Sequence, residues 1–175
     1  MKMEMNKTGM GVNTRDLVET SLLIALVFVA TKCINFQLGG PGGLVHLGNT
    51  MFFVSSIVFG KKKGAISGAV GMGLFDLTSP YAIWAPFTFV IRGVMGYIVG
   101  SIAWSKGRRG NNVSVNIIAI LLSSVWMIAG YYISEVILYS NWITPISSIP
   151  GNITQLVVGL VIGIPTAKVL KKAIK

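Results

Sequence analysis

The sequence predicts an all-α membrane protein with six transmembrane helices and both termini in the cytoplasm. Three observations support this prediction: the composition, the number of apolar segments and the placement of the basic residues. Of the 175 residues, 53% are hydrophobic and only 11% are charged, whereas a soluble domain carries about 25% charged residues. We therefore expect a multi-pass protein of the cell membrane, forming a single transmembrane domain over residues 1–175 with a short cytoplasmic tail at 1–16.

Six apolar segments alternate with polar or glycine-rich stretches. They cover residues 17–34, 46–59, 64–78, 85–104, 115–139 and 149–170. A helix that crosses a bilayer needs about 20 residues, within a range of roughly 17–25. The second and third segments are shorter than that, so we expect them to be tilted inward, shielded by neighbouring helices or extended at their ends.

The basic residues indicate the orientation. All but two of the 15 lysines and arginines lie before the first segment, between the second and third, between the fourth and fifth, or at the end of the sixth. Because cytoplasmic loops carry the excess of Lys and Arg, this pattern places both termini in the cytoplasm. The basic clusters lie between apolar segments without a nucleic-acid-binding motif, so the net charge of +10 does not predict a nucleic-acid partner.

Four charged side chains fall inside the apolar segments: Lys32, Asp76, Arg92 and Glu135. A rise of about 1.5 Å per residue places all four in the outer third of a membrane core about 30 Å thick. Charges buried in a membrane usually face a cavity and mark a site. We expect the two acids to hold Arg92 at the wall of an outward-facing polar cup. The alternative is a purely structural set of ion pairs, with Lys32 extending to the interface.

Further polar and aromatic residues are expected at the same depth. As candidates for hydrogen bonding or stacking we name His46, Asn49, Trp84, Tyr131, Asn152 and Gln155. Aromatic rings with a few convergent polar groups suit a small, flat, polar ligand. The alternative for such residues is an interfacial aromatic belt together with helix caps.

The sequence predicts neither a metal site nor a cofactor. His46 is the single histidine and Cys33 the single cysteine, and one histidine cannot build a zinc site alone. The phosphate-binding pattern G-x-x-x-x-G-K-[ST] is absent from the chain. The protein is therefore not expected to power any transport with ATP by itself.

The stretch QLGGPGGLVHLG at residues 37–48 follows the first segment. Its five glycines and one proline predict a flexible loop rather than a strand, with no partner strand to pair with. We interpret it as a lid over the polar cup. The alternative is a plain connector.

Small residues four positions apart mark several helix faces, and such faces allow close helix approach in lipid. One row leads from Gly64 and Gly68 to Asp76, another from Arg92 to Gly96 and Gly100, and a third contains Gln155. The helices are expected to pack closely near the cytoplasm and to open into a cup lined by Asp76, Arg92 and Gln155. Ser21 and Ala25 form a further small pair, suited either to internal packing or to another protein.

Three stretches carry a resemblance to a known family. HLGNTMFFVSSIVFGKKKGAISGAVGMGLFDL, the following YAIWAPFTFVIRGVMGYIVG and the late IPGNITQLVVGLVIGIPTAKVLKK resemble the substrate-binding S components of energy-coupling factor (ECF) vitamin transporters. The H-L-G-N and I-W-A-P-F stretches are similar to the branch for riboflavin, hydroxymethylpyrimidine or pyridoxine. Ser21 and Ala25 match the small-residue motif of the family's first helix, which usually has alanine at both ends.

The resemblance implies a six-helix fold with an outward vitamin site capped by the first outer loop. It also implies partners, namely a transmembrane coupling protein and two cytoplasmic ATPases, with Ser21 and Ala25 as docking residues. In that family the S component binds its vitamin outside and reorients in the membrane to release it inside. Hydroxymethylpyrimidine or pyridoxine is the favoured ligand here, and riboflavin or pantothenate is the alternative.

Two other classes of function remain as alternatives. A secondary transporter that works alone should show inverted repeats or broken midplane helices, and neither is seen in the sequence. An intramembrane enzyme would use His46, Asp76 and Glu135 as acid and base groups, but no motif pairs a nucleophile with a base. We therefore expect a transport protein that is not an enzyme.

Overall fold

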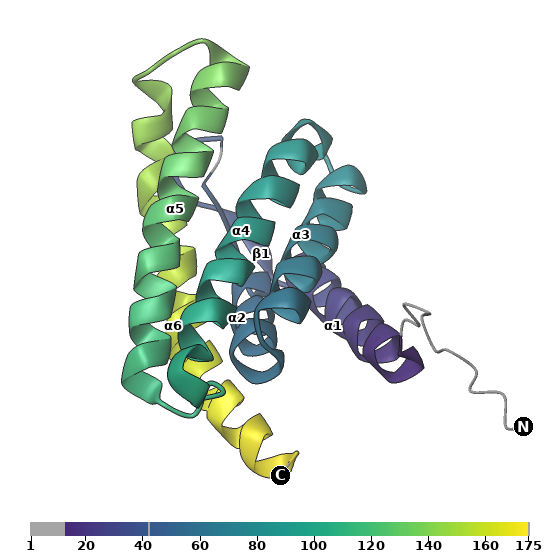
Figure 1. Cartoon of the computed structure of the whole chain (residues 1–175). Coiled ribbons are helices and arrows are strands. Elements are labelled where there is room, and N and C mark those ends of the chain that lie inside the picture. The colour runs from purple at the N-terminus through teal and green to yellow at the C-terminus, as the bar shows by residue number, and fades with distance from the viewer. Residues whose placement is uncertain (1–12, 42, 175) are drawn as a thin grey trace, which may run out of the picture.

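The computed structural model describes residues 13–41 and 43–174. Within these residues the chain forms six α-helices and one β-hairpin (Figure 1). The helices are α1 (Thr14–Cys33), α2 (Gly48–Phe59), α3 (Lys61–Leu77), α4 (Ala85–Ala103), α5 (Val113–Tyr139) and α6 (Ile149–Ala173); the strands are β1 (Asn35–Gln37) and β2 (Leu44–His46). Short 3₁₀ turns cover Ala82–Trp84, Ser105–Gly107 and Thr144–Ser148. The expected tail at 1–16 lies mostly outside the described residues.

The mainly helical class is confirmed. Among the described residues, three stretches are long and apolar enough to cross a membrane: Ala82–Ala103, Val113–Tyr139 and Thr144–Ala173. The helix α2 is apolar but has only 12 residues. Six membrane spans, a single domain and cytoplasmic termini therefore remain predictions.

The short helix α2 lies at the centre of the bundle. It packs against α1, α3, α4 and α6, and every residue from 52 to 58 is buried. Phe52, Phe53 and Ile57 have no exposed surface and belong to the main hydrophobic core. Its neighbours thus shield α2, which is one of the three arrangements expected for this short segment.

The outward faces of the long helices are apolar. Val125 of α5 is 68% exposed, and Val161 and Val169 of α6 are 60% and 67% exposed. Large contiguous apolar surfaces are rare on soluble monomers. In a membrane, lipid chains cover such surfaces. A helix tolerates this environment because its backbone hydrogen bonds are made within the helix itself.

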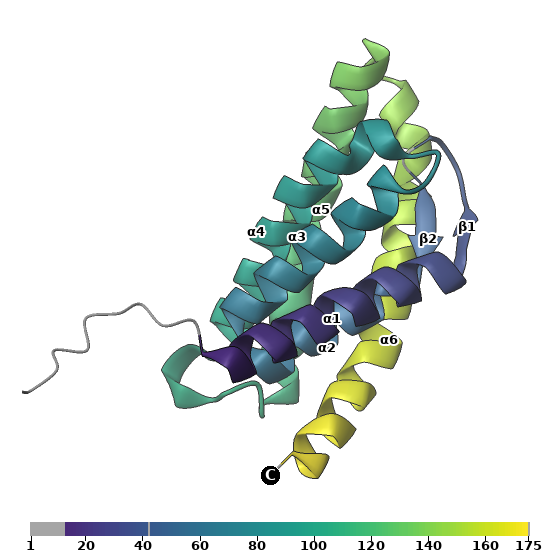
Figure 2. The same ribbon diagram turned by 90° about the vertical axis from the view of Figure 1, so that its right-hand side faces the viewer.

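Glycines bring α3 and α4 into backbone contact, as Figure 2 shows for the two adjacent helices. A Cβ at Gly96 would lie 2.6 Å from the carbonyl oxygen of Gly64, and one at Gly100 would lie 2.4 Å from the Lys61 backbone. Since real Cβ atoms do not approach so closely, these positions accept only glycine without a shift of a helix. The close approach expected from the small-residue rows is confirmed here, at the end of α3 and α4 opposite Asp76.

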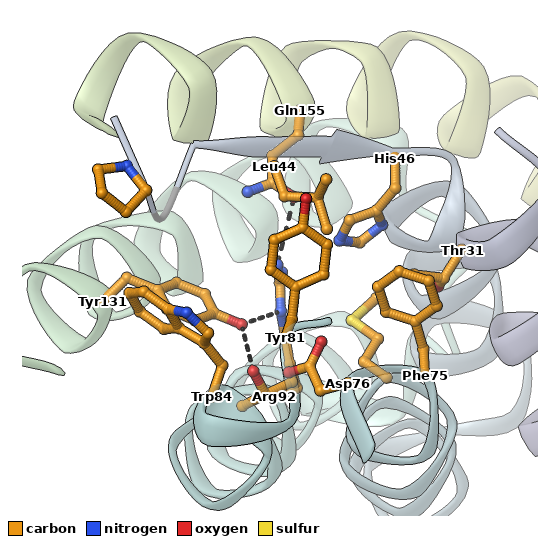
Figure 3. Close-up of a pocket in the computed structure, with 13 residues that line it drawn as sticks. Thr31, Leu44, His46, Phe75, Asp76, Tyr81, Trp84, Arg92, Tyr131 and Gln155 are labelled. Atoms are coloured by element: carbon orange, nitrogen blue, oxygen red, sulfur yellow. Dashed lines mark hydrogen bonds between the residues drawn. The ribbon is translucent and has the colours of Figure 1, made fainter. Parts of the chain in front are cut away.

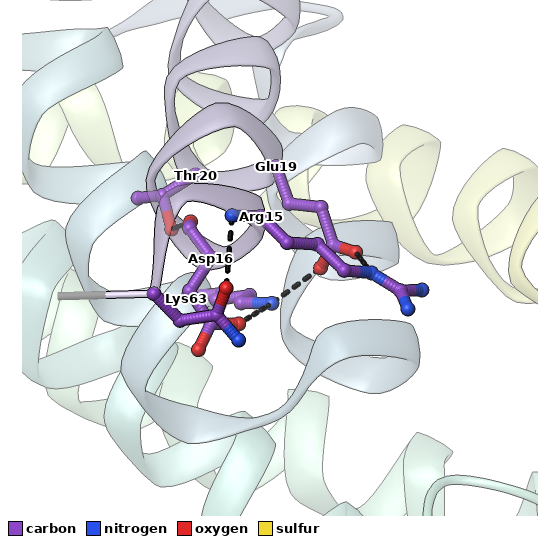
Figure 4. Close-up of polar contacts among 6 residues, drawn as sticks. Arg15, Asp16, Glu19, Thr20 and Lys63 are labelled. Carbon is purple, nitrogen blue, oxygen red and sulfur yellow. Dashed lines mark hydrogen bonds and ion pairs between the residues drawn. The ribbon is translucent and has the colours of Figure 1, made fainter. Parts of the chain in front are cut away.

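An ionic cluster joins the start of α1 to the start of α3 (Figure 4). Lys63 Nζ lies 2.8 Å from Asp16 Oδ1 and also pairs with Glu19. Arg15 Nε donates to Glu19 Oε1 at 2.8 Å. Exposed ion pairs contribute about 0–1 kcal/mol each, but Lys63 and Glu19 at the centre of this cluster are half-buried, so the cluster fixes the start of α1 against α3.

The loop at residues 37–48 corrects one expectation, because part of it forms a strand. β1 and β2 pair antiparallel, with Phe36 opposite Val45. The glycines concentrate in the turn, where Gly39 has φ +84°, and this leaves Leu44, Val45 and His46 free to pair. The partner strand comes from the residues that precede the loop. His46 accordingly ends β2, and the following helix begins only at Gly48.

Candidate functional site

A pocket lies where the hairpin meets the ends of α3 and α4 and the middle of α5 and α6 (Figure 3). Its space not occupied by atoms amounts to about 420 Å³, including the mouth. Thirteen residues line it: Thr31, Pro41, Leu44, His46, Met72, Phe75, Asp76, Tyr81, Trp84, Thr88, Arg92, Tyr131 and Gln155. We call this the Arg92 pocket.

Arg92 is 1% exposed, and neutral groups hold its guanidinium. Nη1 donates to Asn49 Oδ1 at 2.8 Å, and Nε donates to the Tyr131 hydroxyl at 3.1 Å. Nη2 donates to Gln155 Oε1 at 3.3 Å. The sulfur of Met127 lies 3.0 Å from Nη1, and the guanidinium carbon lies 5.2 Å from the Tyr131 ring centre. These contacts come from α2, α5 and α6, so they fix the cation from three sides.

The expected ion pairs of Arg92 are not found. Within the described parts of the chain, no carboxylate lies within ion-pair distance of Arg92; the ion pairs there join Arg15, Asp16, Glu19 and Lys63. Glu135 instead accepts a hydrogen bond from the Ser148 hydroxyl at 2.8 Å, which ties α5 to the turn before α6. When all the hydrogen-bond acceptors of a buried cation are neutral, its positive charge is not compensated by an ion pair.

A chain of carboxamides supports Arg92 from behind. Gln155 Nε2 donates to Asn152 Oδ1 at 2.8 Å, which turns the Gln155 oxygen toward Arg92. Asn49 Nδ2 lies 3.4 Å from both the backbone and side-chain oxygens of Gln155. Asn49 and Asn152 are buried outside the pocket lining. They orient the groups that face the cavity.

Asp76 approaches the same wall from α3. Its carboxylate lies beside the Thr88 hydroxyl, and that hydroxyl lies 3.2 Å from the Tyr131 hydroxyl. Thr88 and Arg92 are four residues apart on α4 and therefore share one face. An acceptor-only carboxylate and a donor-only guanidinium thus line one small space.

Aromatic rings form the outer part of the pocket. The centroids of Trp84 and Tyr131 are 6.2 Å apart with planes tilted by 54°, and those of Phe75 and Tyr81 are 6.3 Å apart and stacked. Rings in these geometries offer flat apolar faces with a polar hydroxyl at the edge.

The hairpin closes the pocket from above. Pro41, Leu44 and His46 belong to its lining. The Gly40 N–H donates to the Ser147 carbonyl at 2.9 Å, and the Tyr81 hydroxyl donates to Gln37 Oε1 at 3.3 Å. The hairpin is therefore held on the α6 side and on the side of the α3–α4 turn, in the position expected of a lid.

The structure brings most of the predicted site residues together. His46, Asp76, Trp84, Arg92, Tyr131 and Gln155 line the pocket, while Asn49 and Asn152 form its polar support. Lys32 lies elsewhere: it is exposed, with its Nζ 5.8 Å from the Phe28 ring centre. Glu135 is also outside the lining. Ser21 and Ala25 lie on the exposed face of α1.

Sequence reasoning did not assign Thr31, Pro41, Leu44, Met72, Phe75 or Thr88 to the site. Two of these carried a usable signal. Thr88 lies one helical turn before Arg92, and Met72 lies one turn before Asp76 on the glycine row. Pro41 and Leu44 depend on the hairpin, which was not expected. Within the described residues, no group of three or more His, Cys, Asp or Glu side chains is placed to hold a metal ion.

Comparison with known proteins assigns this fold to a family. The model of the family described as "ECF-type riboflavin transporter, S component" matches residues 11–172. An uncharacterized protein from the gap 3′ region of Pyrococcus woesei is 32% identical over 149 residues, covering 85% of this chain and 96% of the relative. The thiamine precursor transporter HmpT of Lactococcus lactis subsp. cremoris (strain MG1363) is 29% identical over 164 residues, covering 93% of this chain and 89% of the relative.

A solved structure shows the same fold. The S component of a bacterial ECF transporter superposes with a TM-score of 0.69 at 20% identity, covering 93% of this chain and 98% of that chain. The matched family consists of transporter components rather than enzymes. Because its model matches nearly the whole chain, the protein belongs to the ECF-type riboflavin transporter S component family and is an S component for vitamin uptake.

Proposed function

We propose that this S component binds a single-ring vitamin or vitamin precursor in the Arg92 pocket, with hydroxymethylpyrimidine as the first candidate and pyridoxine as the second. The ligand would enter from the outer side under the hairpin. A transmembrane coupling protein and two cytoplasmic ATPases would then drive its delivery by reorientation of the S component in the bilayer.

The observation that carries the proposal is that Arg92 and Asp76 line the same pocket beside aromatic rings, without forming an ion pair with each other. An aminopyrimidine presents an amine donor next to a ring nitrogen that accepts. Asp76 can accept from the amine, and Arg92 can donate to the ring nitrogen or to the hydroxymethyl oxygen. Nη2 of Arg92 has two N–H groups, and Gln155 Oε1 is its acceptor within the described residues. One donor is therefore available for a ligand.

The small size of the pocket favours the smaller ligands. Its cavity measures only about 40 Å³, below the roughly 300–1,000 Å³ of usual ligand pockets, so even a single ring requires some opening between the hairpin and the helices. Riboflavin has a tricyclic ring and a ribityl chain, so it would require a wider opening between the hairpin and Trp84. Riboflavin nevertheless remains the alternative to the single-ring ligands, because the matched family model carries its name. The relative named as a thiamine precursor transporter favours hydroxymethylpyrimidine.

Titration of the purified protein tests the ligand. We expect hydroxymethylpyrimidine to bind more tightly than pyridoxine, and riboflavin and pantothenate to bind at least ~100-fold more weakly, because neither matches a one-ring pocket. Calorimetry gives the affinities, and mass spectrometry of the purified protein identifies any molecule that remains bound. A yellow preparation that contains stoichiometric flavin would instead establish riboflavin as the ligand.

Dependence on partner subunits is tested by reconstitution. In liposomes the chain alone should bind vitamin without accumulating it, whereas addition of the coupling protein and ATPases with ATP should start uptake. Uptake by the chain alone would show a secondary transporter and contradict this part of the proposal. A vitamin that is chemically changed after uptake would point to an enzyme.

The exposed face of α1 is the proposed docking surface, and the pair Ser21 and Ala25 provides a test. We expect Ser21→Leu and Ala25→Leu each to prevent co-purification with the coupling protein and to leave vitamin affinity within about twofold, because small residues permit close helix approach. Ala129→Leu is a matched control, since Ala129 is an exposed alanine on α5. Equal loss of the complex in all three variants would remove the case for docking at α1.

A further inference from the structure

A second cavity lies far from the Arg92 pocket, between the start of α5 and the end of α6. Its volume is about 300 Å³. Figure 2 shows the C-terminal end of α6 extending away from the rest of the bundle. The lining residues are Gly110, Asn111, Val113, Asn116, Ile164, Lys168, Lys171 and Lys172. Neither the fold nor the vitamin site accounts for this cavity, which we call the α5–α6 cavity.

Among the described residues, the lining of this cavity carries three lysines and no Asp or Glu. Lys171 spans the mouth, with Nζ 3.3 Å from Asn111 Oδ1 and 5.7 Å from the Trp104 ring centre. Lys168 and Lys172 are exposed on α6. In the first turn of α5 the Val115 N–H already donates to Asn112 Oδ1 at 3.0 Å, while the positive end of the helix dipole adds to the field of the lysines. The cavity therefore suits an anion.

Asn116 provides an independent sign of a ligand. Its side chain is 4% exposed and belongs to the cavity lining. Nδ2 donates to the Gly110 carbonyl at 2.9 Å, whereas the buried Oδ1 accepts no hydrogen bond from the described residues. A buried acceptor without a donor costs about 1–3 kcal/mol. A bound molecule with a hydroxyl group beside its anionic group would satisfy both Asn116 and the lysines.

The surroundings of the cavity identify a lipid as the source of that anion. Apolar side chains continue from the cavity along both helices: Ile118 of α5 is 51% exposed, and Val161 and Val169 of α6 are 60% and 67% exposed. Acyl chains can lie along this surface while the headgroup occupies the basic end. Basic pockets between transmembrane helices bind anionic headgroups in this way.

We propose that the α5–α6 cavity binds an anionic phospholipid headgroup that carries a hydroxyl group, with phosphatidylglycerol as the matching chemistry. Lys168, Lys171 and Lys172 contact the phosphate, and a glycerol hydroxyl donates to Asn116 Oδ1. The lipid fills the gap between α5 and α6 and holds the end of α6 against the bundle.

The test uses the full chain in nanodiscs or detergent micelles with defined lipids. Native mass spectrometry and thermal unfolding should show retention of phosphatidylglycerol and a higher Tm than with phosphatidylcholine. The double variant Lys168→Gln/Lys172→Gln should weaken phosphatidylglycerol binding about 10-fold or more, because each lysine near an anionic membrane surface contributes on the order of 1 kcal/mol. The control Lys62→Gln/Lys106→Gln removes two other exposed lysines and should leave binding unchanged.

Three outcomes would overturn the proposal. Equal weakening by the control variant would show general attraction to a basic surface. Equal retention of phosphatidylglycerol and phosphatidylcholine would show that the cavity does not recognise the headgroup. Stabilisation by inorganic phosphate that matches phosphatidylglycerol would assign the cavity to a soluble anion instead of a lipid. Vitamin affinity is measured in parallel and should stay constant, since the two sites are separate.

Discussion

Replacing Arg92 with methionine is expected to weaken vitamin binding by at least ~30-fold, while the protein still inserts and folds. Asn49, Tyr131 and Gln155 hold the guanidinium in one orientation. The guanidinium is therefore positioned before a ligand binds. Loss of one member of a buried, charged hydrogen-bonded contact costs about 2–5 kcal/mol in binding, and each 1.4 kcal/mol or so is tenfold in affinity. Methionine keeps much of the volume and removes both the charge and the donors.

The affinity of Arg92→Met is measured by calorimetry beside that of Arg109→Met, which removes an exposed arginine far from the pocket. A thermal unfolding curve separates lost binding from lost folding. Since buried charges held by neutral groups are costly, we expect the vitamin-free Arg92→Met protein to be about as stable as the original. Unchanged affinity in Arg92→Met would exclude direct contact between Arg92 and the ligand.

Gly96→Ala is expected to have the second large effect, a loss of about 1–3 kcal/mol in stability together with a loss of vitamin binding. The new Cβ would lie 2.6 Å from Gly64 backbone atoms, so α3 and α4 must move apart. Those helices carry Asp76 and Arg92, and small errors in the position of binding groups are expensive. The gain in helix propensity from alanine, at most about 1 kcal/mol, does not offset a clash between backbones.

Gly93→Ala is the matched control for this prediction. It lies three residues away on α4, and its new Cβ would meet the Ala69 Cβ at an ordinary 3.4 Å. The control should therefore be neutral or slightly stabilising in thermal unfolding, and its vitamin affinity should be unchanged. Similar losses in both variants would show that glycine is required for flexibility of α4 rather than for its contact with α3.

The sequence predicted the helices well because their signals are local. The expected segment at 85–104 corresponds to α4 at Ala85–Ala103, and 115–139 corresponds to α5 at Val113–Tyr139. Length, hydropathy and residue spacing along one helix determine such elements. Glycine rows likewise predicted close packing, since they record which face of a helix permits backbone approach.

The arrangement around Arg92 was only half predictable. Counting residues gives the depth of a side chain in the membrane, and that count brought Asp76, Arg92 and Gln155 to one level. The direction in which a side chain points around the helix axis depends on packing against other helices. Glu135 therefore contacts Ser148 rather than Arg92, and carboxamides rather than acids hold Arg92.

The hairpin escaped prediction for a different reason. A pair of strands can be recognised only when both strands are considered together. The glycine-rich stretch at residues 37–48 predicts a loop when it is considered alone, whereas most of β1 lies before it. Three-residue strands also carry too few alternating positions for a period of two to be recognised. The pocket residues Pro41 and Leu44 were missed as a direct result, because only the fold of the hairpin brings them over Arg92.

The backbone contact between α3 and α4 has a consequence for how ligand preference can change in this fold. Because glycines lock the two helices together at the end opposite the pocket, substitutions at positions such as Thr88, Trp84 and Met72 can reshape the cavity without moving its walls. New vitamins can thus be accommodated by exchanging a few side chains at the open end. Recognition can in this sense vary while the α3–α4 contact stays fixed, whereas a change in that contact would disturb recognition as well.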